Sequence, residues 1–404
     1  MNIGVFLIAA SVLAATSPAS AAGGVTLPLP AGCELVGSDR LNSMTKPSRA
    51  SFPPVQMEIR TPFEPTVFAA GGYSYLLYEL HLQNFSDDVF SLESIEVLDA
   101  GSQTPIASFS GERLSEKVVP AGEDKQAVQA GGRAIAFICL AFDSGSAPPG
   151  KLFHRVLFAE AVAEGPVIAT RNRQAKVLAP PVSGADWMAV SGLSIGSHHR
   201  SGLFVAGGLA QISRRYAVDW KRKKQGTFFS GDARDPRSYY AYDQDVLAVA
   251  DSKVVVATDR FPDNNPRTAA GFNTAVPITM DSVAGNSVVL DIGNGQFAYY
   301  AHLKPGSLRV KVGDRVRRGQ SLAKIGNSGD AREPHLHFQV TTGPEILASE
   351  GLPYVIDRFR LKAADGSVHD RKLEFPLGNV LIDLAPTKAC TIDGGKGSLA
   401  DACR

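Results

Sequence analysis

The chain has 404 residues, of which 44% are hydrophobic and 20% are charged, and its formal net charge is +1. Such a length predicts two domains with a short tail, because one core rarely grows to this size. The nearly neutral charge argues against a nucleic-acid partner and against an acidic tail. The 39 glycines and 25 prolines favour short strands joined by turns, so we expect an all-β protein.

Residues 1–22 have the pattern of a secretory signal peptide. Two short apolar runs precede Ala19-Ser20-Ala21, which fits an A-x-A cleavage site, although the first residues carry no lysine or arginine. An uncleaved membrane anchor would need about 20 continuous apolar residues, and polar residues such as Ser11 interrupt this run. A lipoprotein signal ending at Cys33 fits less well, because no leucine precedes it at the usual place. We expect export to the periplasm or the medium, with no stable membrane span after cleavage.

The four cysteines suit an exported protein with one or two disulfides. We favour a Cys390–Cys403 pair, because both residues lie in a glycine-rich tail that has no other obvious anchor. The other two, Cys33 and Cys139, lie far apart in the sequence. Sequence alone does not determine the pairing, and the spacing does not resemble a cysteine metal site.

Residues 23–178 predict a β-sandwich-like domain. The segment Phe90–Leu98 alternates almost strictly between apolar and polar residues, which is typical of a half-buried antiparallel strand. Further strand patterns with glycine, proline and serine loops between them cover 73–82, 133–142 and 152–158. His81 and His154 lie within strand patterns with no second ligand type nearby, so we interpret both as structural.

The segment 180–184 (PPVSG) has the composition of a linker, and residues 185–347 after it predict a second all-β domain. The short connection in 246–257 suggests one hairpin. The turn Gly293-Asn294-Gly295 predicts another, between strands at 286–292 and 297–302. Residues 348–404 predict a β-rich extension that packs on the second domain, followed by a tail.

Five of the eight histidines, namely His198, His199, His302, His335 and His337, fall within the predicted second domain, 185–347. His335 and His337 are two residues apart, so in a strand both side chains would point to one face. A catalytic zinc typically has three protein ligands and one open position for water, and it lets water ionise near neutral pH for attack on an amide carbonyl. Together with His302 and Asp219, these histidines predict a metal site.

Four consecutive motifs make residues 190–345 resemble the lysostaphin/LytM-type zinc metallopeptidases. They are Tyr300-Ala301-His302-Leu303, the glycine turns at 312–320, Gly326-Asn327-Ser328-Gly329 and Pro334-His335-Leu336-His337-Phe338, and they occur in the family's order. The resemblance implies an antiparallel β-fold, a bound zinc ion and cleavage of peptidoglycan peptides.

The resemblance also implies roles for single residues. Asp219 and His337 match two zinc ligands, and His302 and His335 match the two non-ligand histidines that orient water and stabilise the oxyanion. In most of the family the first histidine ligand lies four residues before the aspartate. That position is Arg215 here, which cannot lose its proton to bind a metal. We expect His199, or else its neighbour His198, to replace it if the segment 201–213 folds back, and we favour His199.

Three functions follow from these patterns. The first is an exported zinc endopeptidase that acts on peptidoglycan cross-links. The second, expected if Arg215 breaks the zinc site, is an inactive LytM-like protein that binds cell wall or activates another hydrolase. The third is a carrier domain, because the turns at 312–326 also resemble those of lipoyl and biotinyl domains and of sugar-system phosphocarriers. Lipoyl and biotinyl domains need a lysine at the tip of a tight turn flanked by methionine or similar residues, and this segment has none in that setting. A two-histidine phosphocarrier would be cytosolic, which disagrees with the predicted signal peptide.

Overall fold

The computed structural model describes residues 25–37, 54–120, 126–159, 161–170, 173–269, 271–378 and 380–385. The predicted signal peptide, Cys390 and Cys403 lie outside these residues. Strands dominate the described chain, which confirms the all-β expectation. The described helical segments are short, namely α1 (Gly111–Ser115) and the 3-10 helix η1 (Pro236–Ser238). Neither is long or apolar enough to cross a membrane.

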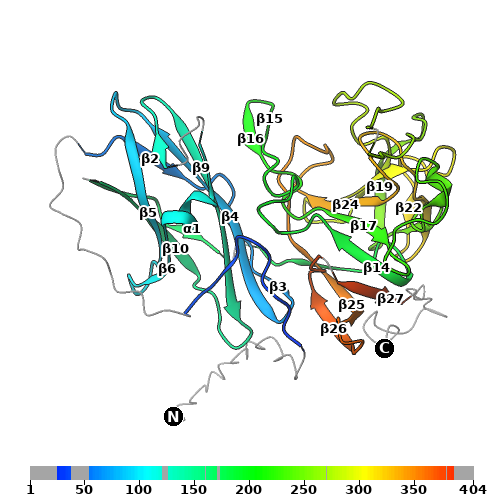
Figure 1. The fold of residues 1–404 in the computed structure, drawn as a ribbon, viewed down its shortest axis with the longest axis horizontal. Coiled ribbons are helices and arrows are strands. Elements are labelled where there is room, and N and C mark those ends of the chain that lie inside the picture. The colour runs from blue at the N-terminus through cyan, green and yellow to red at the C-terminus, as the bar shows by residue number, and fades with distance from the viewer. Residues whose placement is uncertain are drawn as a thin grey trace, which may run out of the picture.

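Two sheets form a sandwich in the N-terminal half (Figure 1). The first contains β1 (Glu34–Leu35), β2 (Met57–Arg60), β3 (Phe68–Ala70), β4 (Tyr73–Asn84), β7 (Val118–Pro120) and β9 (Arg133–Asp143). The second contains β5 (Phe90–Asp99), β6 (Pro105–Ser110), β8 (Ala127–Val128), β10 (Lys151–Phe158), β11 (Ala161–Glu164) and β12 (Ile168–Ala169). The central pairs, β4 with β9 and β5 with β10, are antiparallel.

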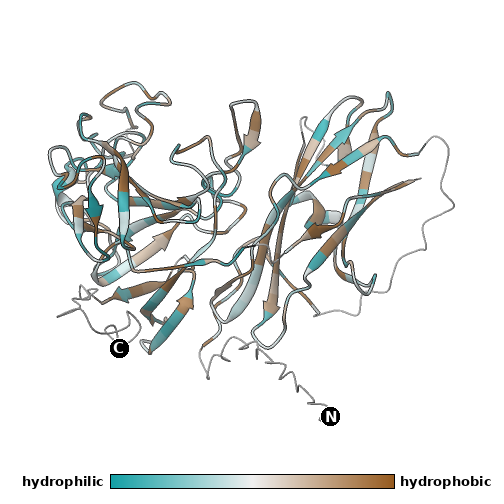
Figure 2. Cartoon of the chain, turned by 180° about the vertical axis from the view of Figure 1, so that it is seen from behind, coloured by the Kyte–Doolittle hydropathy of each residue, from teal (hydrophilic) through white to brown (hydrophobic). Residues whose placement is uncertain are grey.

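Strand β4 is buried on both faces, which explains its nearly continuous apolar sequence. Leu76 and Tyr78 point into the core between the two sandwich sheets. Tyr75 and Leu77 point the other way and join the core of the C-terminal half, because successive side chains of a strand alternate between its faces. The two halves therefore share a packed interface along β4, where Figure 2 shows long strands coloured mainly brown and white.

A disulfide joins Cys33 to Cys139, 106 residues apart. It fastens β1 alongside β9, with which β1 pairs in parallel. The disulfide that the structure shows is thus not the tail pair that we favoured from the sequence. The tail pair, Cys390 with Cys403, lies outside the described residues. The glycine-rich sequence of the tail carried no information on which residue Cys33 would contact.

The C-terminal half is built on one long mixed sheet. Its strands are β13 (Lys176–Leu178), β14 (Gly184–Val190), β17 (Val218–Arg222), β19 (Ser252–Thr258), β20 (Asn286–Asp291), β21 (Phe297–Leu303), β22 (Arg315–Val316), β24 (Leu336–Thr341), β25 (Tyr354–Lys362), β26 (Val368–Glu374) and β27 (Leu381–Leu384). Their order is β13-β25-β27-β14-β17-β24-β21-β20-β19-β22, with β26 beside β25. The predicted C-terminal extension therefore continues this sheet through β25 and β27. The domain limits themselves stay a prediction.

Two small ribbons complete the fold. They are β15 (Phe204–Ala206) with β16 (Leu209–Gln211), and β18 (Asp245–Leu247) with β23 (Ser321–Lys324). The predicted hairpin within 246–257 is wrong, because β18 pairs with β23 while β19 pairs with β20 and β22. The connection lacks the Asn-Gly or Asp-Gly pair that closes tight hairpins. The hairpin predicted around Gly293-Asn294-Gly295 is confirmed by the pairing of β20 with β21.

The segment predicted as a linker is packed into the molecule. Pro180, Pro181 and Val182 are buried. The Ala179 amide donates a hydrogen bond to the Val249 carbonyl at 2.9 Å, and the Leu247 amide donates one to the Pro181 carbonyl at 2.8 Å. Proline and glycine content alone does not distinguish a free connection from one whose backbone groups are satisfied internally.

Candidate metal centre

Three neighbouring strands at the middle of the long sheet carry most of the predicted site residues. Asp219 on β17 lies directly opposite His337 on β24, and His337 lies opposite Ala301 on β21. Directly opposite residues share a face of the sheet, which brings Asp219 and His337 together. His302 follows Ala301 with a φ of +63°, a left-handed backbone that is uncommon for residues other than glycine.

The loop between β14 and β15 supplies the histidine that the usual position lacks. The β15–β16 ribbon, which turns at Gly207-Gly208, folds the intervening segment back as expected. The His199 side chain is buried, and its ring centroid lies 4.8 Å from that of His337. His198 is exposed. Ligand atoms of His198, His199 and Asp219 all lie within 4.8 Å of one another, so both histidines stand near the carboxylate.

The turn Gly326-Asn327-Ser328-Gly329 holds His302. The Ser328 carbonyl faces His302 Nδ1 at 2.9 Å, and Ser328 Oγ donates to the Leu303 carbonyl at 2.8 Å. Gly329 has a φ of +74°, and a Cβ there would meet the Gly285 amide nitrogen at 2.3 Å. The glycine lets two backbones approach closely, so the motif has a positioning role in addition to being a turn.

The hydrogen-bond partners fix where each buried imidazole carries its proton. Backbone carbonyl oxygens only accept, so the nitrogens that face them are protonated. These nitrogens are His199 Nδ1, 3.3 Å from the Ala217 carbonyl, and His335 Nδ1, 2.7 Å from the Glu333 carbonyl. In each neutral ring the lone pair is then on Nε2. Those Nε2 atoms lie 3.6 Å (His199) and 3.4 Å (His335) from Asp219 Oδ1.

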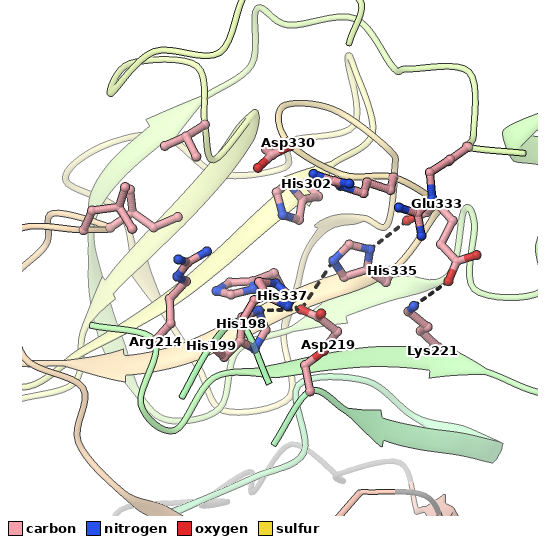
Figure 3. Close-up of a pocket in the computed structure, with 16 residues that line it drawn as sticks. His198, His199, Arg214, Asp219, Lys221, His302, Asp330, Glu333, His335 and His337 are labelled. Atoms are coloured by element: carbon pink, nitrogen blue, oxygen red, sulfur yellow. Dashed lines mark hydrogen bonds and ion pairs between the residues drawn. The ribbon is translucent and has the colours of Figure 1, made fainter. Parts of the chain in front are cut away.

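Gln339 fixes the third ring. The Gln339 amide nitrogen donates to the Ile346 carbonyl at 3.1 Å, so its Oε1 faces His337 Nε2 at 2.9 Å and accepts a hydrogen bond from the ring N–H. His337 Nδ1 then turns its lone pair to Asp219 Oδ1 at 3.0 Å. Three imidazole lone pairs and one carboxylate oxygen therefore converge (Figure 3). Such mutually repelling groups are stabilised by a cation between them, and nitrogen and oxygen ligands of this kind suit zinc.

Burial sets the charge states of the site. It lowers the pKa of His199 to about 3, and it also lowers the pKa of His198 and of His302, the last one well below its usual value. These rings are therefore neutral at neutral pH, the form that binds a metal. Burial alone would raise the pKa of Asp219, but its interactions with His199 and His335 and its hydrogen bonds outweigh that effect and hold the pKa well below the usual range.

The residues line a pocket of about 550 Å³ that also contains arginines. Arg214 stands beside the histidines with its guanidinium turned into the pocket (Figure 3). Its Nε is buried without a hydrogen-bond partner among the described residues. A Cβ on Gly202 would come within 2.6 Å of one guanidinium nitrogen, so the glycine makes room for this side chain. Sequence reasoning missed both Arg214 and Gln339, which no motif marks.

Arg215, at the family's usual ligand position, lies outside the pocket. Its guanidinium contacts Glu79 of β4, with Nη2 2.7 Å from Glu79 Oε2 and Nε 3.1 Å from both carboxylate oxygens. The structure thus brings His199, Asp219, His302, His335 and His337 together and separates Arg215 from them.

Comparisons with known proteins identify a family domain in the C-terminal half. Residues 239–347 match the family model described as Peptidase family M23. The peptidoglycan DD-endopeptidase ShyA of Vibrio cholerae is 30% identical over 132 residues, which are 33% of this chain and 28% of that protein. The cell division protein DipM of Caulobacter vibrioides is 36% identical over 62 residues, 15% of this chain and 10% of that protein. The matches thus span 28% and 10% of the lengths of these two relatives.

Among solved structures, a zinc-containing peptidase from Vibrio cholerae aligns with 66% of this chain and 53% of its own, at 16% identity and a TM-score of 0.25. A likeness at that score supports no conclusion about activity. The family match covers the segment that carries His302, His335 and His337, while His199 and Asp219 lie before it.

Proposed function

Because residues 239–347 form a Peptidase family M23 domain, we propose that this chain is an exported zinc endopeptidase that hydrolyses peptide bonds of peptidoglycan. The observation that carries the proposal is the convergence of imidazole nitrogens from the two candidate histidine ligands, His199 and His337, on one oxygen of Asp219. A metal cation between these groups would accept both lone pairs and balance the carboxylate charge, because the other nitrogen of each ring is engaged by the Ala217 carbonyl or by Gln339.

His199, Asp219 and His337 would hold the metal. His199 is preferred to His198 because it is buried and lies against His337, whereas His198 is exposed. Zinc, when bound, supplies a Lewis acid that polarises a carbonyl and lowers the pKa of water. Asp219 contributes the negative charge that balances the ion, and the Ala217 carbonyl and Gln339 orient the two rings.

His302 and His335 would act on the reacting groups. Their ring centroids lie 5.0 Å apart, and each Nδ1 is committed to a backbone carbonyl. The free Nε2 of a neutral ring accepts a proton from the attacking water, and the resulting N–H donates to the oxyanion or to the leaving amine. One ring could therefore accept a proton from water while the other, once protonated, donates a hydrogen bond to the oxyanion.

Arg214 would bind a carboxylate of the peptide substrate. Burial lowers its pKa, although Asp219 and Asp330 oppose that effect, and the side chain still carries a charge at neutral pH. A guanidinium with a buried, unpartnered nitrogen gains most from a charged acceptor. This contact would place an anionic peptide beside the histidines.

Export is supported by the Cys33–Cys139 disulfide, because such bonds persist in oxidising compartments. The name of ShyA, a peptidoglycan DD-endopeptidase, supports a substrate in the cell wall. The inactive, wall-binding alternative was motivated by Arg215. With Arg215 outside the pocket and His199 beside Asp219, that motivation is gone.

Metal analysis combined with a cleavage assay tests the proposal. Purified protein should contain about one zinc per chain and release peptides from isolated peptidoglycan, with activity lost to a chelator and restored by zinc. Asp219→Ala should lose both the metal and the activity. Asp232→Ala is the control, since Asp232 is an exposed aspartate that does not line the pocket. A folded wild-type protein that binds no zinc would disprove the proposal.

A further inference from the structure

The loop that carries His199 is fastened to the N-terminal sandwich. Arg200, the next residue, is 1% exposed and its Nη1 contacts Glu79 Oε1 on β4. Its Nη2 donates to the Tyr78 carbonyl at 3.0 Å and to the Ile138 carbonyl at 3.3 Å, and its guanidinium lies 4.9 Å from the centre of the Phe137 ring. All of these partners belong to β4 and β9, which are strands of the sandwich.

The segment that carries Asp219 reaches the same carboxylate. Arg215, four residues before Asp219, contacts both Glu79 oxygens. Its Nη2 also lies 2.8 Å from Glu350 Oε2, a charge contact that is not aligned as a hydrogen bond. The hydroxyl of the neighbouring Tyr216 donates to the Leu77 carbonyl at 3.1 Å. Glu79 therefore links two chain segments, each of which carries one candidate metal ligand.

The position of Glu79 follows from the alternation along β4. It shares its face with Tyr75 and Leu77, the residues that pack into the C-terminal half. Glu79 is 3% exposed, Arg200 1% and Arg215 3%. A carboxylate between two guanidiniums attracts both and offsets their mutual repulsion, which solvent screens little in this setting, and Glu350 supplies a second negative charge beside Arg215.

From these contacts we infer that Glu79 is a positioning residue of the metal centre, so that the N-terminal sandwich completes a site whose ligands all lie in the C-terminal half. The inference rests on the proposed metal site and goes beyond it. Asp219 and His337 are held by the central strands, whereas His199 stands on a loop that the neighbouring Arg200–Glu79 contact fastens to the sandwich. Loss of Glu79 leaves the buried Arg200 cation without its carboxylate, leaves Arg215 with Glu350 alone, and loosens that loop.

Zinc affinity of the whole chain, measured by competition with a chromophoric chelator, tests this inference. Glu79→Gln should weaken zinc binding about 10- to 100-fold, the usual effect of losing a group that orients a ligand. Glu96→Gln is the matched control. Glu96 is also 3% exposed, but it lies on β5 in the sandwich sheet that faces away from the metal centre. We expect its zinc affinity to stay within about twofold of wild type, since no ligand depends on it.

A second variant separates positioning from folding. Glu79→Asp keeps the charge and withdraws the carboxylate by one methylene, so it should fold and show a smaller loss of zinc affinity than Glu79→Gln. The melting temperature of each variant is measured beside its zinc affinity. A general loss of packing would lower the zinc affinity of Glu96→Gln as well, whereas a loss of positioning lowers it only in the Glu79 variants. Wild-type affinity in both Glu79 variants would overturn the inference while leaving the proposed function intact. A wild-type protein without zinc affinity would overturn both.

Discussion

Buried histidines occur in both halves of the molecule, and they differ in what their nitrogens face. In the sandwich, His154 Nε2 lies 2.8 Å from the Tyr78 hydroxyl, which can donate or accept as the ring requires. In the C-terminal half, both nitrogens of His337 face oxygens that accept, those of Asp219 and Gln339. Burial alone therefore does not mark a candidate metal ligand, and the two nearby acceptor oxygens are what distinguish His337 from His154.

The largest effect is expected at the histidine that reaches the site from the loop. His199→Ala should lower activity on the order of 1000-fold or more, because a zinc site with one ligand missing neither retains nor activates the ion. His198→Ala should retain zinc and most activity, since that ring is exposed. Zinc stoichiometry of the two variants decides the assignment, and the opposite pattern would move the ligand to His198.

The next effect separates a catalytic ring from a ligand ring. His302→Ala should lower kcat about 100- to 1000-fold, as does the loss of one group that stabilises an oxyanion. Zinc content should stay at the wild-type level because Asp219, His199 and His337 remain. Steady-state kinetics and metal analysis of one preparation of His302→Ala measure its kcat and its zinc content. Loss of zinc in this variant would show that His302 is a ligand.

A smaller effect is expected at the unpaired arginine of the pocket. Arg214→Ala should raise KM for an anionic peptide about tenfold, the value of one charge-assisted contact. Arg214→Lys should recover part of this, since it restores the charge without the planar fork. A peptide whose carboxylates are amidated is the control substrate. Equal KM changes for both peptides would remove the proposed carboxylate contact.

The smallest effect is expected at His154 of the sandwich, which should make the free energy of unfolding depend on pH and should not affect activity. Burial lowers the pKa of His154 to about 3, against about 6.5 when unfolded. A depressed histidine pKa means that the unfolded chain binds the extra proton first. The contribution of neutral His154 to the free energy of unfolding is therefore fully present above pH 6.5 and is lost as the pH falls from 6.5 towards 3.

Between pH 7.5 and pH 5, the shifted pKa of His154 lowers the free energy of unfolding by about 2 kcal/mol. His154→Gln should reduce the pH dependence of the unfolding free energy by about that amount, measured by urea unfolding at the two pH values. The other histidines contribute equally to the pH dependence of wild type and of His154→Gln, so the difference between the two proteins reports on His154. An unchanged pH dependence would mean that His154 is not held neutral.

Sequence reasoning predicted the motif-bearing part of this molecule well and the contacts between its halves poorly. The alternation of strands and the His-x-His spacing have fixed geometric meaning, so the all-β class and the meeting of His335, His337 and His302 could be expected. Local spacing says nothing about which distant strand packs against which. The Arg215–Glu79 contact, the Cys33–Cys139 bond and the burial of 180–182 all depend on such pairings.

The pairing of Asp219 with His337 across β17 and β24 also bears on how fast a metal exchanges. These two proposed ligands stand on adjacent strands in the interior of a sheet, so they keep their separation when no ion is bound. They would offer a metal ion two side chains at a fixed spacing, without the chain having to fold around it. Zinc loading of the finished protein should accordingly be rapid and reversible, unlike that of domains whose folding and metal binding are one event.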